Sequence, residues 1–263
     1  MANNSALNGV LGILHRHFLV WRGSFISQAA TFMLDPLVFL LAFGYGMGSA
    51  FTSMGGVPYM AFVAPGMAGS AIMYSAIIES AYSGISRLQM QGTYHAIIST
   101  PVRPGEVVAA EIIWAAFKAT ICAVFVLAVS AFFTPFTLNP LAWVGALAAY
   151  YLGGTAIAAT GVFYMSFCRG YEQLNYMWPL FISPMFLFCG VFFSIDRYPE
   201  ALQLLAQFLP MTHILQAARP LLIQQPLALE AYLGHIGILL GWTLVFGTLA
   251  YRRIYNRLID VVN

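Results

Sequence analysis

Six long runs of apolar residues alternate with short polar stretches along the chain. Each run holds about 20 or more residues, which is enough for one helix to cross a bilayer. Turns rich in glycine and proline separate the runs. The predicted spans are residues 24–46, 59–85, 107–133, 141–167, 173–193 and 231–251. We therefore predict an all-α membrane protein with six transmembrane helices in a single transmembrane domain, residues 1–263.

The segment 5–22, before the first span, is amphipathic. At 3.6 residues per turn its apolar side chains form a stripe about 100° wide, with Arg16 on the opposite face. The stripe consists of Leu7, Val10, Leu11, Leu14, Phe18 and Trp21. Such a helix can lie in the membrane interface. It can equally pack on the protein's own spans, and the two readings are compatible.

Segment 194–230 is apolar but broken by four prolines into pieces too short to span a membrane. We predict two short helices here, at about 199–208 and 212–223, that dip into the far interface. A last span at 231–251 and a polar tail at 252–263 follow.

The longest polar interruption in the first two-thirds of the chain is RLQMQGTYHAIISTPVRPGE at 87–106. Gly92 and Thr93 can open a short helix, and Pro101 ends it because the residue before a proline is pushed out of the α region. A second helix can begin with Pro104 and Glu106 in its first turn. The simpler alternative is a hairpin that only reverses the chain.

Composition places most of the protein in lipid. Of its 263 residues, 60% are hydrophobic and 8% are charged, whereas a soluble domain carries about 25% charged residues. Six spans put both ends and the 87–106 stretch on one side. That side holds Arg16, Arg22, Arg87, Arg103, Arg169, Arg252, Arg253 and Arg257. Because short loops rich in arginine stay in the cytoplasm, we predict an inner-membrane protein with cytoplasmic termini and no cleaved signal peptide.

Four charged residues fall inside or near the ends of the predicted spans. Asp35 and Lys118 lie at a similar depth with opposite signs, so we hypothesise that they pair near the midplane. Glu79 and Glu111 lie together near the cytoplasmic face, where they could bind a cation or engage Arg87. Each charge needs such a reason, because it costs at least about 2.5–3.5 kcal/mol at the bilayer centre. Lys118, Glu79 and Glu111 could alternatively extend to the interface.

The chain lacks the motifs of an enzyme or a metal protein. It has neither a GxxxxGK[ST] phosphate loop nor an HExxH pair, and its histidines show no ligand spacing. Its three cysteines lie in or beside apolar runs and suggest no disulfide framework. We expect no catalytic residue, no bound metal, no cofactor and no nucleic-acid partner.

Three stretches resemble a known family. YMAFVAPGM at 59–67 is similar to the start of span two in permeases of type-2 ABC transporters. The run at 77–119 resembles the coupling region of those permeases. Their external re-entrant segment resembles residues 193–222, FSIDRYPEALQLLAQFLPMTHILQAARPLL. The likeness covers essentially the whole chain. It is strongest to the branch that exports lipochitooligosaccharide nodulation factors and related lipid-linked glycans.

This resemblance implies a division of labour between subunits. ATP and magnesium would bind a separate ATPase subunit, and two permeases would join two ATPases in the membrane. A coupling helix at about 93–100 would dock on the ATPase, and helices at 199–223 would gate the exit. The implied coupling residues are Arg87, Thr93, Tyr94, His95, Ile97, Ile98 and Arg103, and the implied gate residues are Pro210, His213 and Arg219.

The resemblance also implies a substrate route along spans one, two and five, with membrane lipid around it. Aromatic side chains there could contact sugars and acyl chains; they are Phe39, Phe43, Tyr74, Tyr176, Trp178, Phe181, Phe186 and Phe188. An exporter of hydrophobic small molecules or drugs is the alternative within this class. A proton-coupled transporter using Glu79 and Glu111 is a different class, and GYGMG at 44–48 weakly suggests an ion channel.

Overall fold

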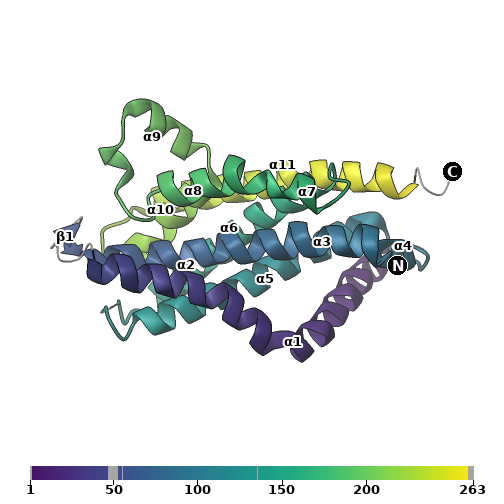
Figure 1. Ribbon diagram of the computed structural model, residues 1–263, viewed down its shortest axis with the longest axis horizontal. Coiled ribbons are helices and arrows are strands. Elements are labelled where there is room, and N and C mark those ends of the chain that lie inside the picture. The colour runs from purple at the N-terminus through teal and green to yellow at the C-terminus, as the bar shows by residue number, and fades with distance from the viewer. Residues whose placement is uncertain (1, 47–52, 55, 135, 260–263) are drawn as a thin grey trace.

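Long helices run side by side along one axis of the molecule (Figure 1). The computed structural model describes residues 2–46, 53–54, 56–134 and 136–259, including all of these side chains except those of 2–6, 24–33 and 259. Strands in these ranges are limited to the hairpin of β1 (Ser53–Met54) and β2 (Val57–Pro58). The predicted all-α architecture is confirmed.

The helical elements follow the order of the predicted spans. The first half contains α1 (Ala2–Gly46), α2 (Tyr59–Ile77), η1 (Ile78–Tyr82), α3 (Ser83–Ile85), η2 (Ser86–Met90), α4 (Thr93–Ile98) and α5 (Pro104–Ser130). The second half contains α6 (Pro140–Met165), α7 (Tyr171–Asn175), η3 (Trp178–Ile182), α8 (Ser183–Phe188), η4 (Ile195–Arg197), α9 (Glu200–Gln207), α10 (Pro210–Leu222) and α11 (Leu229–Ile259).

Four helices in the described ranges are long and apolar enough to cross a membrane. They are Tyr59–Met90, Pro104–Ser130, Pro140–Met165 and Leu229–Leu258. The apolar end of α1, Leu34–Gly46, is shorter. The predicted fifth span is divided into α7, η3 and α8, with Pro179 and Pro184 at the starts of the last two. The count of six crossings therefore stays a prediction.

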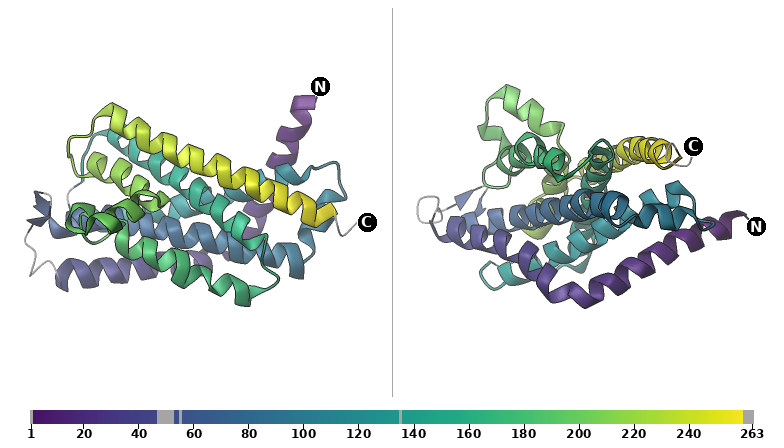
Figure 2. Two further views of the ribbon diagram at one scale, coloured as in Figure 1. Left: turned by 90° about the horizontal axis from the view of Figure 1, so that it is seen from above. Right: turned by 45° about the vertical axis from the view of Figure 1, so that its right-hand side comes forward.

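Helix α1 joins two elements that the sequence predicts to be separate. The interfacial segment 5–22 and the first span at 24–46 form one continuous helix. Figures 1 and 2 show that this helix bends. Its first part runs at an angle to the bundle axis toward α4, and its second part runs along α2. The amphipathic segment is thus joined to the first span without a break in the helix.

Helix α2 lies at the centre and continues beyond its predicted end. With η1, α3 and η2 it is helical from Tyr59 to Met90, and it packs against α1, α5, α6 and α10. The helix continues five residues beyond the predicted end of this span at residue 85, through the wider turn of η2. Arg87 therefore lies in the helix and not in a loop.

Small residues allow close backbone approach between α2 and the segment after α8, and between α5 and α6. A Cβ at Gly66 would lie 2.7 Å from the Val191 carbonyl oxygen, and a Cβ at Gly154 would lie 3.2 Å from Ala116 Cα. Close backbone approach of this kind is how helices associate in lipid, where apolar burial supplies no driving force.

The two ends of the bundle differ. Helix α4 lies at one end, with the start of α1 and the last turns of α11; we call this the α4 end (Figures 1 and 2). The hairpin and α9 lie at the opposite end, the α9 end. The two short helices predicted at 199–208 and 212–223 correspond to α9 and α10. Helix α11 continues through most of the predicted tail, and Met47 and Gly48 of the GYGMG motif lie outside the described residues.

Candidate functional site

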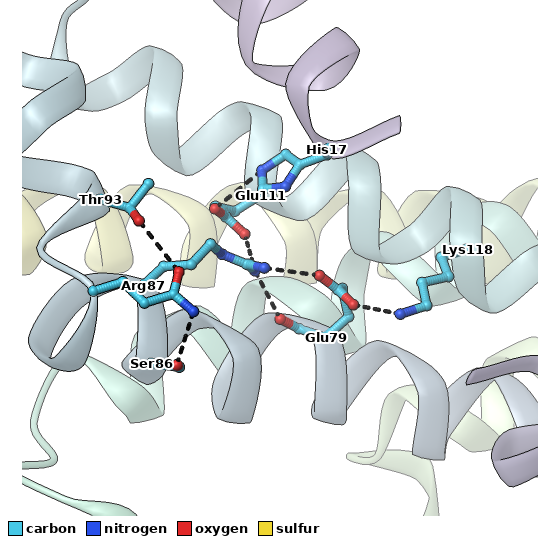
Figure 3. A network of polar contacts seen from close by, with 8 residues as sticks. His17, Glu79, Ser86, Arg87, Thr93, Glu111 and Lys118 are labelled. Atoms are coloured by element: carbon cyan, nitrogen blue, oxygen red, sulfur yellow. Dashed lines mark hydrogen bonds and ion pairs between the residues drawn. The ribbon is translucent and has the colours of Figure 1, made fainter. Parts of the chain in front are cut away.

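A buried cluster of five charged and polar side chains lies near the α4 end (Figure 3). Arg87 is at its centre, with Nη1 3.0 Å from Glu79 Oε1 and Nη2 2.5 Å from Glu111 Oε2. Lys118 Nζ lies 2.6 Å from the other Glu79 oxygen, and His17 Nε2 lies 3.2 Å from Glu111 Oε1. We call these five residues the charge network.

The helical geometry explains why these side chains meet. Glu111 and Lys118 are seven residues apart on α5, which is about two turns, so they share a face. Glu79 and Arg87 are eight residues apart, and at 3.6 residues per turn they would point about 80° away from each other. Both lie in π-helical segments, η1 and η2, whose wider turns reduce this offset. The π segments thus bring Arg87 onto Glu79.

The charges in the network balance one another. Two carboxylates face one guanidinium and one ammonium, and the side chains of all four are 10% exposed or less. The network joins α1, α2 with its continuation, and α5, since His17 also stacks on Trp114 with ring centroids 5.6 Å apart. A buried pair of this kind is destabilising to break, because removal of one partner leaves the other charge buried alone.

The short helix α4 is anchored directly beside the network. Gly92 adopts φ +61°, a left-handed conformation that suits glycine, and this turn starts α4. Tyr94 points inward and is 1% exposed, with its hydroxyl near Arg87 and Glu111 but without a hydrogen bond of its own. Burial raises the pKa of the Tyr94 phenol well above its ordinary value, so it stays protonated at physiological pH. Thr93 Oγ1 donates to Gln91, whose amide donates to Ser86 Oγ (Figure 3).

The other residues of the predicted coupling set face outward to different extents. His95, Ile97 and Ile98 are half-buried on α4, and Arg103 is exposed just before α5. A groove of about 500 Å³ runs between α1 and α4, with Thr93 and Ile97 on its α4 side. The structure therefore separates this set into three groups: Arg87 and Tyr94 are buried, the other α4 residues are more accessible, and Arg103 lies at the start of α5.

The structure does not show the hypothesised pair between Asp35 and Lys118. Lys118 is bound to Glu79, and the Asp35 side chain is exposed on α1. No ion pair joins the two residues in the described ranges. Equal depth was insufficient for this inference, because the rotation of each helix about its own axis decides which side chains meet.

The predicted gate residues lie together at the α9 end. Arg219 is buried, donates to the Gly190 carbonyl oxygen at 2.6 Å, and lies 3.9 Å from the centre of the Phe62 ring. His213 Nε2 bonds the Gln207 carbonyl oxygen at 2.8 Å, and its Nδ1 lies 3.0 Å from His235 Nδ1. Pro210 is buried in the first turn of α10. These contacts fasten α10 to α2, to the end of α8 and to α11.

A comparison with models of known protein families identifies the family of this chain. The model of the ABC-2 type transporter family matches residues 10–223. The chain belongs to the ABC-2 type transporter family. ABC-2 permeases are multi-pass proteins of the inner membrane and are transport subunits rather than enzymes. They work with a separate ATP-binding subunit, so this chain is the transmembrane subunit of an ABC exporter.

Relatives from several bacteria cover most of this ABC-2 chain. It is 31% identical to Nodulation protein J of Rhizobium leguminosarum bv. viciae over 229 residues, which is 87% of each protein. It is 29% identical to Nodulation protein J of Rhizobium meliloti (strain 1021) over 88% of this chain and 85% of the relative. It is 23% identical to Inner membrane transport permease YadH of Escherichia coli (strain K12) over 78% of each protein.

Sequence reasoning overlooked two parts of the charge network. His17 has no role in the sequence-based prediction, and Lys118 is paired there with Asp35, where the structure has Glu79. The alternative in which Glu79 and Glu111 engage Arg87 is the one that the structure contains. The spacing of eight between Glu79 and Arg87 does not by itself place them on one α-helical face, and the π turns that bring them together are not visible in the sequence. In the described ranges, no group of three or more His, Cys, Asp or Glu side chains is placed to hold a metal ion.

The network makes a prediction about stability. Replacing Arg87 by Met removes the partner of two buried carboxylates, so Arg87→Met is expected to lower the stability of the purified permease by about 3–5 kcal/mol. Adding Glu111→Gln, which removes one stranded charge, is expected to restore part of the loss. Thermal unfolding in detergent measures both effects. Arg103→Met, at an exposed site, is the control. Equal melting temperatures for the Arg87 and Arg103 variants would contradict the role of the network.

Two variants of Tyr94 distinguish the contribution of packing from that of hydrogen bonding to the anchoring of α4. Tyr94→Phe removes a hydroxyl that makes no hydrogen bond, so this variant is expected to keep the wild-type hydrogen exchange at α4. The two proteins should agree throughout pH 6 to 9, because the wild-type phenol stays protonated over that range. Tyr94→Ala leaves a cavity and is expected to loosen α4, with a loss of about 3–5 kcal/mol. Hydrogen exchange at the α4 amides, with those of α5 as reference, measures this. Similar exchange in the two variants would show that Tyr94 does not anchor α4.

Proposed function

We propose that this permease exports a lipid-linked oligosaccharide or a similar amphipathic glycolipid from the cytoplasmic leaflet to the outside. The relatives named Nodulation protein J support this branch of the family. The observation that carries the proposal is a row of aromatic side chains along α1, α2 and the η3–α8 segment.

The aromatic row begins beside the charge network. Tyr82 stacks on Tyr171 with centroids 6.2 Å apart, and the Tyr82 hydroxyl accepts a 2.6 Å hydrogen bond from Trp178 Nε1. Trp178 stacks on Tyr74 at 5.7 Å, and Tyr74 contacts Phe186 at 5.8 Å. The row therefore leads from η1 toward the α9 end.

At the α9 end the row becomes purely apolar. Phe186 contacts Phe39 at 5.6 Å and Phe192 at 5.1 Å, and Phe43 contacts Phe192 at 4.5 Å. Phe39 is 38% exposed, so part of this surface is accessible in the single chain. Flat aromatic faces bind the apolar faces of sugars as well as acyl chains. A row of this length suits an elongated amphipathic substrate.

Two copies of the chain would form the complete path. In this proposal two permeases pair with their aromatic rows facing a common passage, and each binds one ATPase through α4. Both termini and α4 would then lie in the cytoplasm, as the arginine distribution predicts. Closure of the ATPase dimer would move α4 and, through Tyr94 and the charge network, α1, α2 and α5.

The contacts argue against proton-coupled transport. Both carboxylates that such a mechanism would use, Glu79 and Glu111, are held by Arg87 and by Lys118 or His17. Carboxylates already engaged by fixed partners are poorly suited to bind and release a proton in each transport cycle. Export of a hydrophobic small molecule stays the alternative, because the apolar half of the row would also suit it.

Transport by the purified permease–ATPase complex in proteoliposomes tests the proposal. Trp178→Leu removes a flat surface in the middle of the row and is expected to reduce movement of a fluorescent lipid-linked oligosaccharide by about tenfold, since stacking contacts contribute on the order of 1 kcal/mol each. Phe125→Leu, an exposed site on α5 outside the row, is the control. In Trp178→Leu, movement of the same lipid without its sugar is expected to fall less than movement of the lipid-linked oligosaccharide.

Two outcomes would contradict the glycolipid proposal. The first is equal transport of the glycolipid by wild type, Trp178→Leu and Phe125→Leu. The second is transport of a hydrophobic dye, but of no glycolipid, by the wild-type complex.

A further inference from the structure

A cavity of about 490 Å³ lies between α1, the η1–η2 continuation of α2, α5 and α7. This size falls within the roughly 300–1,000 Å³ of small-molecule sites. The cavity is near the α4 end, directly beside the charge network and the first residues of the aromatic row. It adjoins the groove between α1 and α4 that faces the proposed ATPase contact, and Arg16 and Gln91 line both.

The wall of this cavity carries an excess of positive charge. Arg16, Arg87 and Lys118 line it, whereas Glu79 is the acidic residue among its lining residues. Glu111 holds Arg87 through Nη2, so even with both acids counted the wall keeps one uncompensated cation. His17 also lines the cavity and would add charge if protonated.

Two of these cations have unused hydrogen-bonding capacity. Arg16 is partly exposed, and within the described ranges no acceptor is paired with its guanidinium. Arg87 Nε is buried and has no hydrogen-bond partner, although both of its Nη atoms are bound. A buried donor without a partner costs free energy that an acceptor entering the cavity would recover.

The rest of the wall is aromatic. Trp21 and Trp114 meet edge to face on one side, with centroids 5.8 Å apart, and Tyr82 stacks on Tyr171 on the other. Tryptophan and tyrosine are enriched where a polar head group meets acyl chains. Because Tyr82 also begins the aromatic row, a head group held in this cavity would lie at the entrance to the proposed path.

We infer that this cavity binds the phosphate-bearing head group of an anionic amphipathic lipid, with Arg16 and Arg87 as its main ligands. This inference rests on the proposed function and deepens it, because it assigns the point at which an anionic lipid enters. The phosphate could belong to a bulk phospholipid or to the carrier lipid of the substrate. An acceptor that approaches Arg87 would compete with Glu79 and Glu111. Binding of a head group in the cavity would therefore alter the contacts of the charge network beside α4.

Native mass spectrometry of the purified permease–ATPase complex without nucleotide tests this site. Three probes are compared at equal concentration: phosphatidylglycerol, a short-chain polyprenyl phosphate and zwitterionic phosphatidylcholine. The wild-type complex is expected to retain at least one anionic probe about tenfold more than phosphatidylcholine, and the retained probe identifies the source. Inorganic phosphate at millimolar concentration is expected to reduce that retention.

Arg16 allows a matched variant, because no ion pair of the network depends on it. Arg16→Gln is expected to lower retention of the anionic probe about tenfold, the effect of losing one charge-assisted hydrogen bond. Arg16→Lys is expected to restore part of it. Arg22→Gln is the control, since Arg22 lies on the same helix but is exposed and does not line the cavity.

The outcomes separate this inference from the proposed function. Equal retention of anionic and zwitterionic probes by the wild type, or equal retention by Arg16→Gln and Arg22→Gln, would overturn the head-group site even if glycolipid export is observed. Selective retention that depends on Arg16 would support the site even if the complex exports no glycolipid, in which case the proposed function alone would fail.

Discussion

The cost of holding charge away from water governs this permease. Glu79, Arg87, Glu111 and Lys118 lie on helices that are apolar enough to span a membrane, and each of these groups alone would be strongly destabilising there. They are tolerated because each carboxylate oxygen of the network faces a cation or His17. The π turns, the position of Lys118 two turns beyond Glu111, and the stacking of His17 on Trp114 all serve this arrangement.

One consequence is a connection among elements that are distant in sequence. The first part of α1, the end of the central helix, the start of α5 and the buried side of α4 meet at the charge network and Tyr94. We propose that force from the ATPase enters through this connection. A lipid head group at Arg16 and Arg87 would lie on the same connection, so the loading of substrate and the movement of α4 would be linked by one guanidinium.

The sequence predicted those features that depend on local chemistry. Gly92 and Pro101 delimit α4, Pro199 and Pro210 lie at the starts of α9 and α10, and the apolar runs locate the long helices. Pro220, which was also predicted to break the segment, lies inside α10. It could not predict features set by the rotation and bending of helices. These include the single bent α1, the continuation of α2 through two π segments, and the choice of Glu79 over Asp35 as the partner of Lys118. Depth along a helix can be counted, but the direction of a side chain depends on how its helix is packed.

The most direct test of the network's role is the ratio of glycolipid molecules moved to ATP molecules hydrolysed by the purified complex in proteoliposomes. Glu111→Gln keeps the shape of the side chain but weakens its hold on Arg87 and His17, whereas Glu172→Gln on α7 changes an exposed acid outside the network. We expect Glu111→Gln to keep most of its ATP hydrolysis while the ratio falls about tenfold, as for the loss of a coupling free energy between two sites. Glu172→Gln should match the wild type. An unchanged ratio in Glu111→Gln would contradict the account, whether hydrolysis and transport both stay at the wild-type level or both fall in proportion.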